Sequence, residues 1–253
     1  MMLLTEVAVV LFSFFAMLVD CSLGMGYGSI LTPLLLLLGF SPMLVVPSML
    51  LAVIFNGVAG GAAHHFKGNV NFDRESIPLK KVLFVVSSGL LGVVASVIFA
   101  TSVPQNILKG IIGSVIMVTG AVVYRNRRAR PFSWAKFGLL SLVASFNQGI
   151  SGAAYGPLMT SGQILMGGKT KPSIGITVLS EGLISIFAVL AYISMGGIFP
   201  NLRFAALLVI GAVPAAPLAA SIVRGSTRKS LSHSIGGLTV ALGMLTILSA
   251  VVK

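Results

Sequence analysis

Residues 24–28 read Gly-Met-Gly-Tyr-Gly, and residues 152–156 read Gly-Ala-Ala-Tyr-Gly, 128 positions later. The chain has only four tyrosines, and each of these two Tyr-Gly breaks interrupts a long apolar stretch. In membrane proteins, paired interruptions at corresponding places in two halves point to a binding site near the bilayer midplane. The two breaks therefore organise the interpretation of the whole chain.

Composition places the chain in a membrane. Of its 253 residues, 56% are hydrophobic and only 9% are charged, and the mean hydropathy is +1.04. A soluble domain carries about 25% charged residues. No basic region precedes the first apolar run, so we expect this run to be retained rather than cleaved as a signal peptide. The single cysteine, Cys21, excludes an internal disulfide.

Glycine, proline and charged residues divide the chain into ten apolar segments. We expect all of them to be helical, because a backbone in lipid must satisfy its own hydrogen bonds. The short segments on either side of each Tyr-Gly break reach only about 22 Å, against a hydrocarbon core of about 30 Å. Each short pair is therefore either a tilted hairpin or a re-entrant hairpin with its turn inside the protein. The segments cover residues 4–20, 25–39, 43–66, 82–103, 107–124, 136–150, 154–168, 172–195, 203–223 and 231–252.

Basic residues indicate the orientation. If the loops after the third, fifth, seventh and ninth segments share one side, that side carries fourteen of the 17 Lys and Arg residues. The positive-inside rule makes it the cytoplasmic side of the cell (inner) membrane. The net charge of +12 is then a topology signal, and we expect no nucleic-acid partner. The fourteen are Lys67, Arg74, Lys80, Lys81, Arg125, Arg127, Arg128, Arg130, Lys136, Lys169, Lys171, Arg224, Arg228 and Lys229.

Five segments in each half is an odd number, so the second half must enter the membrane from the opposite side. The predicted fold is an all-α polytopic membrane protein. It has two inverted-topology halves of about five helical segments, a broken helical hairpin at the start of each half, and both termini outside. We expect the first transmembrane repeat to cover residues 1–124, a basic cytoplasmic linker residues 125–135, and the second repeat residues 136–253.

Further matched residues support the repeat. Ser48 corresponds to Thr177 in the third segment of each half. In the last segment, two glycines recur with the same spacing, and small residues let helices approach closely. Such a face serves packing within the chain or a homodimer. The glycines are Gly113 and Gly120 in the first half, and Gly236 and Gly243 in the second.

Several stretches carry a family resemblance: the break at Asp20–Gly28, the run Thr32-Pro33-Leu34, the segment start Pro47-Ser48-Met49, the basic linker, and the second break at Asn147–Gly156. On these residues the chain resembles the TauE/SafE family of sulfite-exporter-like membrane proteins over essentially its whole length. The resemblance implies export of sulfite, related sulfur oxyanions or organosulfonates, usually across prokaryotic inner membranes. The resemblance supplies no site residues, so these are predicted from physical arguments.

A helix should begin at each break, near Ser29 and near Pro157, and proline is favoured at the first helical position. Helix N-termini carry unsatisfied N–H groups and a partial positive charge, so they bind oxyanions. Glycine at positions 26 and 28 permits unusual dihedral angles and close approach to a ligand. Two such N-termini, brought together by the inverted repeat, would form a cavity rich in donors without a buried Lys or Arg.

Polar side chains gather near the same breaks. Tyr27 and Tyr155 are candidates to donate hydrogen bonds to a substrate or to act as gates. The alternative is that the Tyr, Asn and Gln side chains only satisfy backbone groups of the breaks. The predicted substrate-binding residues are Gly26, Tyr27, Gly28, Ser29, Ser48, Asn147, Gln148, Gly152, Tyr155, Gly156 and Thr177.

Two carboxylates are candidates for proton coupling. Glu181 lies near the middle of its segment, where a carboxylate costs about 2.5–3.5 kcal/mol on insertion scales and is usually functional. The alternative is a neutral Glu181 held by a Ser or Asn hydrogen bond. Asp20 is the second candidate, with helix capping as its alternative role.

The chain shows no nucleophile with a base, no phosphate-binding loop and no Cys, His and carboxylate cluster that would hold a metal. We therefore expect no catalytic residues and no cofactor. The predicted function is secondary transport of a small sulfur-containing anion by alternating access at a midplane site. The alternatives are a passive anion channel, an intramembrane enzyme, and a scaffold without transport.

Overall fold

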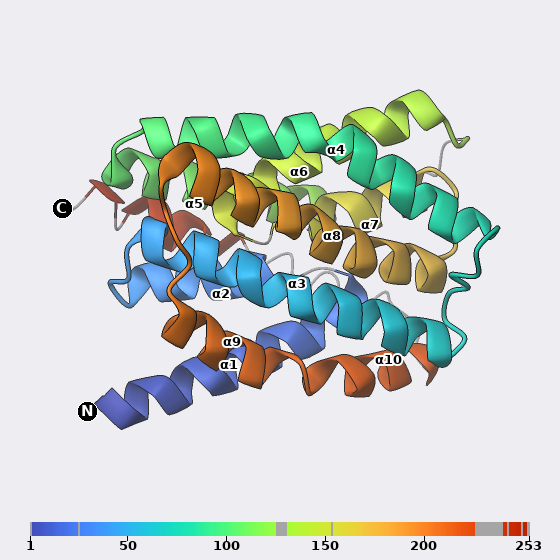
Figure 1. Ribbon diagram of the computed structural model, residues 1–253, viewed down its shortest axis with the longest axis horizontal. Helices are drawn as coiled ribbons and strands as arrows, with labels where there is room; N and C mark the ends of the chain where they lie inside the picture. The colour runs from blue at the N-terminus through green and yellow to red at the C-terminus, as the bar shows by residue number, and fades with distance from the viewer. Residues whose placement is uncertain are drawn as a thin grey trace.

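The computed structural model describes residues 2–24, 26–124, 131–152, 154–225, 240–241, 243–248 and 250–251. This part of the chain consists of helices and short connections, with no strand (Figure 1). The helices are α1 (Met2–Leu23), α2 (Tyr27–Leu37), α3 (Pro42–Phe66), α4 (Ile77–Ser102), α5 (Gln105–Tyr124), α6 (Trp134–Ser151), α7 (Gly156–Leu165), α8 (Thr170–Gly196), α9 (Leu202–Ala212) and α10 (Ala215–Gly225).

Length and hydropathy make five described stretches candidate membrane spans. Helices α2 and α7 have 11 and 10 residues, too few to cross about 30 Å of hydrocarbon at about 1.5 Å per residue. The prediction of an all-α polytopic membrane protein is confirmed. The candidate spans are Glu6–Leu23, Pro42–Phe66, Ile77–Ser102, Thr170–Gly196 and Leu202–Val223.

Helices α1 and α2 form one hairpin, and α6 and α7 form another. The turn of each hairpin lies inside the protein: Gly24 and Gly152 are buried, and Tyr27 and Tyr155 have no exposed surface. In each hairpin the buried turn leads into a helix too short to span, α2 or α7, whereas α1 is itself long enough to be a candidate span. The backbone at such a turn is not helical, and it is tolerated at membrane depth because protein surrounds it.

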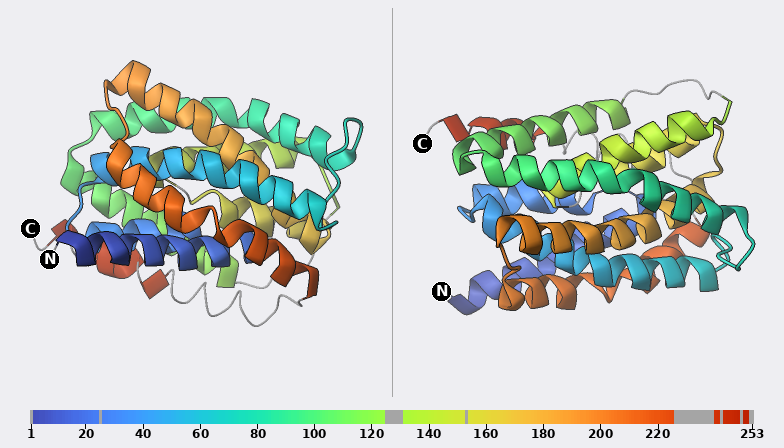
Figure 2. Two further views of the ribbon diagram at one scale, coloured as in Figure 1. Left: turned by 60° about the horizontal axis from the view of Figure 1, so that its bottom comes forward. Right: turned by 45° about the horizontal axis from the view of Figure 1, so that its top comes forward.

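Apart from the two buried breaks and the bend between α9 and α10, the described connections between helices fall at two ends of the molecule (Figure 1). The α3–α4 loop and the α7–α8 turn lie at one end, and the α2–α3, α4–α5 and α8–α9 connections lie at the other (Figures 1 and 2). The first end therefore carries the basic stretches 67–81 and 169–171 together. Of the other two predicted basic stretches, residues 125–130 and 226–229 lie outside the described residues, whereas Lys136 lies in α6 and Arg224 in α10.

The backbone conformation repeats along the chain. In the described residues, a positive φ angle occurs only at glycines, which adopt it without strain. Gly24 (φ 67°) is matched by Gly152 (φ 87°), and Gly39 (φ 93°) is matched by Gly167 (φ 79°), both 128 positions later. The two halves thus turn at corresponding points of the sequence.

Helices of different halves make the main core of the molecule: α3 packs against α8, α4 against α6, and α1 against α9 and α10. Where α3 meets α8, a Cβ atom on Gly57 would collide with the backbone of Gly182, and the reverse is also true. Only glycine at both positions allows the two backbones to approach so closely.

One hydrogen bond occurs in both halves with the same spacing. In the first half, His64 Nε2 donates to Cys21 O across 2.9 Å, and in the second Tyr192 OH donates to Gly149 O across 2.8 Å. The two donors, His64 and Tyr192, are 128 positions apart, and so are the two acceptors, Cys21 and Gly149. A side chain of the long third helix of each half thereby holds the end of the helix that precedes the break.

Several sequence-based boundaries differ from the structure. The segment at 203–223 is two helices, α9 and α10, because Pro214 has no N–H to donate and ends the first of them. Helix α2 begins at Tyr27 rather than near Ser29, since Gly26 O already accepts from Ile30 N at 2.9 Å. Most of the predicted tenth segment, with Gly236, and residues 125–130 of the predicted linker 125–135 lie outside the described residues. Within the chain, Gly113 lies against the backbone of Gly243.

Candidate functional site

The first break joins α1 to α2 through two glycines in unusual conformations. Gly24 has φ 67° and Gly26 has φ 139°. The side chain of Asp20, in the last turn of α1, reaches across the break. Its Oδ1 accepts a hydrogen bond from Tyr27 N, the first residue of α2, across 3.2 Å. A carboxylate of the chain itself thus occupies an N–H group at the positive end of α2.

The second break joins α6 to α7 and has different chemistry. Helix α6 ends at Ser151, followed by Gly152 in the left-handed conformation. The Ser151 hydroxyl accepts a hydrogen bond from Ala154 N across 3.1 Å. Helix α7 then begins at Gly156, with Pro157 in its first turn. No carboxylate caps this helix, so its N-terminus remains a neutral set of donors.

Two threonines bind the breaks to one another. Thr32, on α2, donates its hydroxyl to Ser151 O at the second break across 2.7 Å. Thr160, on α7, donates its hydroxyl to Gly24 O at the first break, also across 2.7 Å. Each hairpin therefore satisfies a carbonyl that the other hairpin leaves free, and the two breaks lie close together in the core.

A small cavity with room for about one water molecule lies beside the first break. Asp20 and Glu181 line it, and each is only 3% exposed. Asn56 is 1% exposed, and neither atom of its amide has a hydrogen-bond partner; Glu181 Oε1 also lacks one. The complete lining is Met17, Asp20, Tyr27, Val53, Asn56, Gly57, Val178 and Glu181.

The cavity is acidic. Its lining contains two carboxyl groups and no Lys, Arg or His, and the charges of Asp20 and Glu181 are close enough to interact. Unpaired buried charges are costly, so the arrangement favours a group or ion that neutralises the carboxylates. No group of three or more His, Cys, Asp and Glu side chains in the described residues is placed to hold a metal ion.

The second break also has buried polar atoms without a hydrogen-bond partner, on Tyr155 and Gln148. They are the hydroxyl of Tyr155 and Oε1 of Gln148. Gln148 Nε2 donates to Ser185 Oγ across 2.9 Å, and Ser185 donates to Glu181 O across 2.8 Å. This chain of contacts links the second break to the helix turn that carries Glu181.

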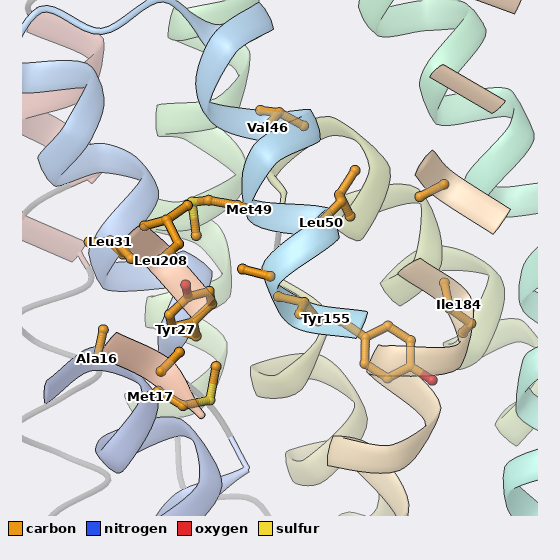
Figure 3. Close-up of a cluster of buried hydrophobic side chains, with 14 of the residues drawn as sticks. Ala16, Met17, Tyr27, Leu31, Val46, Met49, Leu50, Tyr155, Ile184 and Leu208 are labelled. Atoms are coloured by element: carbon orange, nitrogen blue, oxygen red, sulfur yellow. The ribbon is translucent and has the colours of Figure 1, made fainter. Parts of the chain in front are cut away.

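The two break tyrosines do not face each other. Figure 3 shows Tyr27 and Tyr155 on opposite sides of the α3 segment that carries Met49 and Leu50. The Tyr27 hydroxyl lies 3.1 Å from Ser13 Oγ. Because Ser13 donates its own proton to Leu208 O, Tyr27 must donate to Ser13. Tyr27 is thus satisfied within the protein, whereas the hydroxyl of Tyr155 makes no hydrogen bond, although Ser141 and Ser180 lie near it.

Most of the predicted binding residues lie at the breaks, but two do not. Ser48 Oγ accepts from Asn201 N across 3.1 Å, at the start of α9. Thr177 lies 3.0 Å from the Thr160 hydroxyl. The sulfur of Met49 takes the corresponding place beside Thr32, at 3.2 Å, so the predicted match of Ser48 with Thr177 is displaced by one residue. The predicted binding residues that do lie at the breaks are all buried: Gly26, Tyr27, Gly28, Ser29, Asn147, Gln148, Gly152, Tyr155 and Gly156.

Asn56 is the main residue that the sequence interpretation missed. An amide in the middle of an apolar membrane helix is itself a signal, because polar groups at that depth are costly. Thr32 and Thr160 were missed as well, although they follow the two break tyrosines at the same distance along the chain. That shared distance was the signal that could have found them.

Comparison with known proteins agrees with this architecture. The family model described as "Sulfite exporter TauE/SafE" matches residues 9–247. A protein of Bacillus subtilis (strain 168), described as "Probable membrane transporter protein YtnM", is 27% identical over 246 residues, which cover 92% of this chain and 79% of that relative. No solved structure matches the chain. The resemblance found in the sequence is therefore confirmed, and the chain belongs to the TauE/SafE sulfite exporter family of membrane transporters.

Proposed function

We propose that the protein is a secondary transporter of a small sulfur-containing anion, such as sulfite, thiosulfate or an organosulfonate. The observation that carries the proposal is the meeting of two buried helix breaks, joined by the Thr32 and Thr160 hydrogen bonds. Broken helices at the interface of two repeats are a common way to form a transport site. Membership of a sulfite exporter family supplies the substrate class.

We propose further that the halves are inverted repeats that rock against each other to give alternating access. Three kinds of feature with the same spacing support this: the left-handed glycines, the paired crossing threonines, and the matched bonds of His64 and Tyr192. The main helix contacts join the two halves, which is the interface that such a motion would remodel.

The anion is proposed to bind through neutral donors rather than through a basic side chain. Helix α7 offers the first-turn N–H groups other than that of Pro157, and the buried hydroxyl of Tyr155 makes no hydrogen bond, although Ser141 and Ser180 lie near it. Donors at a helix N-terminus suit an oxyanion because they match its acceptor oxygens and its charge.

The proposed orientation places the basic end of the molecule in the cytoplasm and both termini outside. The stretches 67–81 and 169–171 support it, since they lie at one end and such loops remain cytoplasmic. A bacterial cell membrane is the proposed location.

The test is uptake of ³⁵S-labelled sulfite into proteoliposomes, with thiosulfate, sulfate and chloride as competitors. A transporter gives saturable uptake that unlabelled sulfite on the opposite side accelerates by counterflow. A passive channel gives flux without counterflow. Uptake no greater than in empty liposomes, with protein that elutes as a single folded species, would exclude sulfite as the substrate.

A further inference from the structure

Resting on the proposed function, the geometry points to a further role for the first break. We propose that Asp20 is an internal anion that holds the substrate's place at the N-terminus of α2, and that a sulfur anion binds there only after Asp20 takes up a proton. Asp20 Oδ1 already accepts from Tyr27 N across 3.2 Å. The first N–H group of α2 is therefore engaged by a negative group before any substrate arrives.

The cavity next to this contact has the donors that an oxyanion needs. Asn56 is 1% exposed, and its Nδ2 carries two N–H donors without a partner. Protonated Asp20 and Glu181 would each add an O–H donor, whereas their ionised forms only accept. Proton uptake thus changes the lining from a set that repels an anion to a set that binds one.

The charges around Asp20 leave no other source of neutralisation. Tyr27 of α2 donates its hydroxyl to Ser13. Cys21 of α1 is buried beside Asp20, and His64 of α3 is engaged with Cys21 O. The remaining titratable group is Glu181 of α8, which carries the same charge as Asp20, and no Lys or Arg lines the cavity. Two carboxylates and an anion cannot share this space without protons.

Space supports displacement rather than simple addition. The cavity has room for about one water molecule, which is too little for an anion built of several heavy atoms. Asp20 is the lining side chain whose departure would free both volume and the N–H group of Tyr27. Gly24 and Gly26 lie between Asp20 and α2, so the backbone there has the conformational freedom that such a movement needs.

The second break lacks this device. The residue 128 positions after Asp20 is Gln148, a neutral amide that donates to Ser185 and leaves its Oε1 without a partner. The two breaks are therefore unequal: the α7 N-terminus has no carboxylate that an anion must displace, whereas the α2 N-terminus accepts an anion only together with a proton. The proposal thus couples the movement of the anion to that of a proton.

The test is equilibrium binding of ³⁵S-thiosulfate, and separately of methanesulfonate, to the purified full chain over a pH series. Both probes keep a constant charge, so any pH dependence belongs to the protein. In the wild type, affinity should fall about tenfold for each pH unit above the titration of Asp20, as one bound proton per anion requires. Asp20→Asn keeps an oxygen that can cap Tyr27 N without a charge and should bind at high pH about tenfold or more tightly than the wild type. Its pH profile should be flatter, because Glu181 is then the one carboxyl left in the cavity lining.

Two further variants complete the design. Asn56→Leu should lose affinity at every pH while the slope with pH persists, because it removes a donor and not a titrating group. Asp73→Asn, which removes an exposed loop carboxyl, should match the wild type. Binding without pH dependence, or an Asp20→Asn variant that binds no better at high pH, would overturn the proton-gated site and leave the transporter proposal standing. Absence of binding in wild type and Asp20→Asn at every pH would overturn both.

Discussion

Thr32 and Thr160 make the same hydrogen bond in opposite directions. Each lies five positions after a break tyrosine, and each donates its hydroxyl across 2.7 Å to a backbone carbonyl at the other break. A bond of this kind needs both hairpins to be in place. The pair therefore links the assembly of the first half of the chain to that of the second.

Replacing either threonine by valine should destabilise the protein by about the same amount. Each variant leaves a buried carbonyl without its donor, which costs about 1–3 kcal/mol. Denaturant titration of purified protein in micelles would measure the loss. Thr101→Val is the matched control, since Thr101 donates to Val97 O within its own helix and lies at the end of α4. Unequal losses for Thr32 and Thr160 of more than about 2 kcal/mol would contradict their equivalence.

The α3–α8 crossing should tolerate no side chain. Gly57→Ala and Gly182→Ala each place a Cβ against the backbone of the partner helix, and overpacking of this kind costs about 1–3 kcal/mol. Gly110→Ala on α5 is the control, because its Cβ would meet only Ala250 at 3.9 Å. Thermal unfolding in detergent should show lower midpoints for the first two variants. The midpoint of the third should equal that of the wild type. Equal midpoints in all three would refute the backbone contact.

Removing the two break hydroxyls should have different effects. Tyr27→Phe deletes a hydrogen bond to Ser13 and should cost about 1 kcal/mol of stability. Tyr155→Phe deletes a hydroxyl without a partner and should change stability by less than about 0.5 kcal/mol. If Tyr155 contacts the substrate, its variant should raise the KM for sulfite about tenfold. A large loss of stability in Tyr155→Phe, with transport unchanged, would show that the hydroxyl is structural.

The orientation can be checked with cysteines placed at exposed positions of the connections in a Cys21→Ala background. Lys67→Cys and Lys169→Cys lie in connections at one end of the molecule, and Gln105→Cys and Phe199→Cys at the other. In intact cells, a thiol reagent that does not cross the membrane should label only the second pair. Labelling of only the first pair would show that the orientation is the reverse of the proposed one. Labelling of cysteines from both pairs would contradict the fold.

The sequence predicted the breaks and most helix boundaries because these depend on local chemistry. Glycine clusters stop helices, and apolar length defines the spans. The sequence did not predict that Asn56 shares a cavity with Glu181, because this depends on which face of α3 packs against α8. The same dependence on packing explains why the role of Ser48 was not predicted. Its hydroxyl accepts a hydrogen bond from Asn201 N, which lies in a connection far along the chain. Asp20 was predicted as a proton carrier or a cap, and the structure places it as a cap beside a second carboxyl.

The contact of Gly57 with Gly182 also bears on how the molecule can move. Packed helices usually resist rotation against each other because their side chains interlock. Here two backbones meet directly, while one turn away the side chains of Val178 and Leu179 of α8 pack against Gly60 and Gly61 of α3. The point at which α3 and α8 approach most closely therefore lies directly beside the cavity that Asn56 and Glu181 line. A small change in the angle between these helices would change the shape of that cavity first.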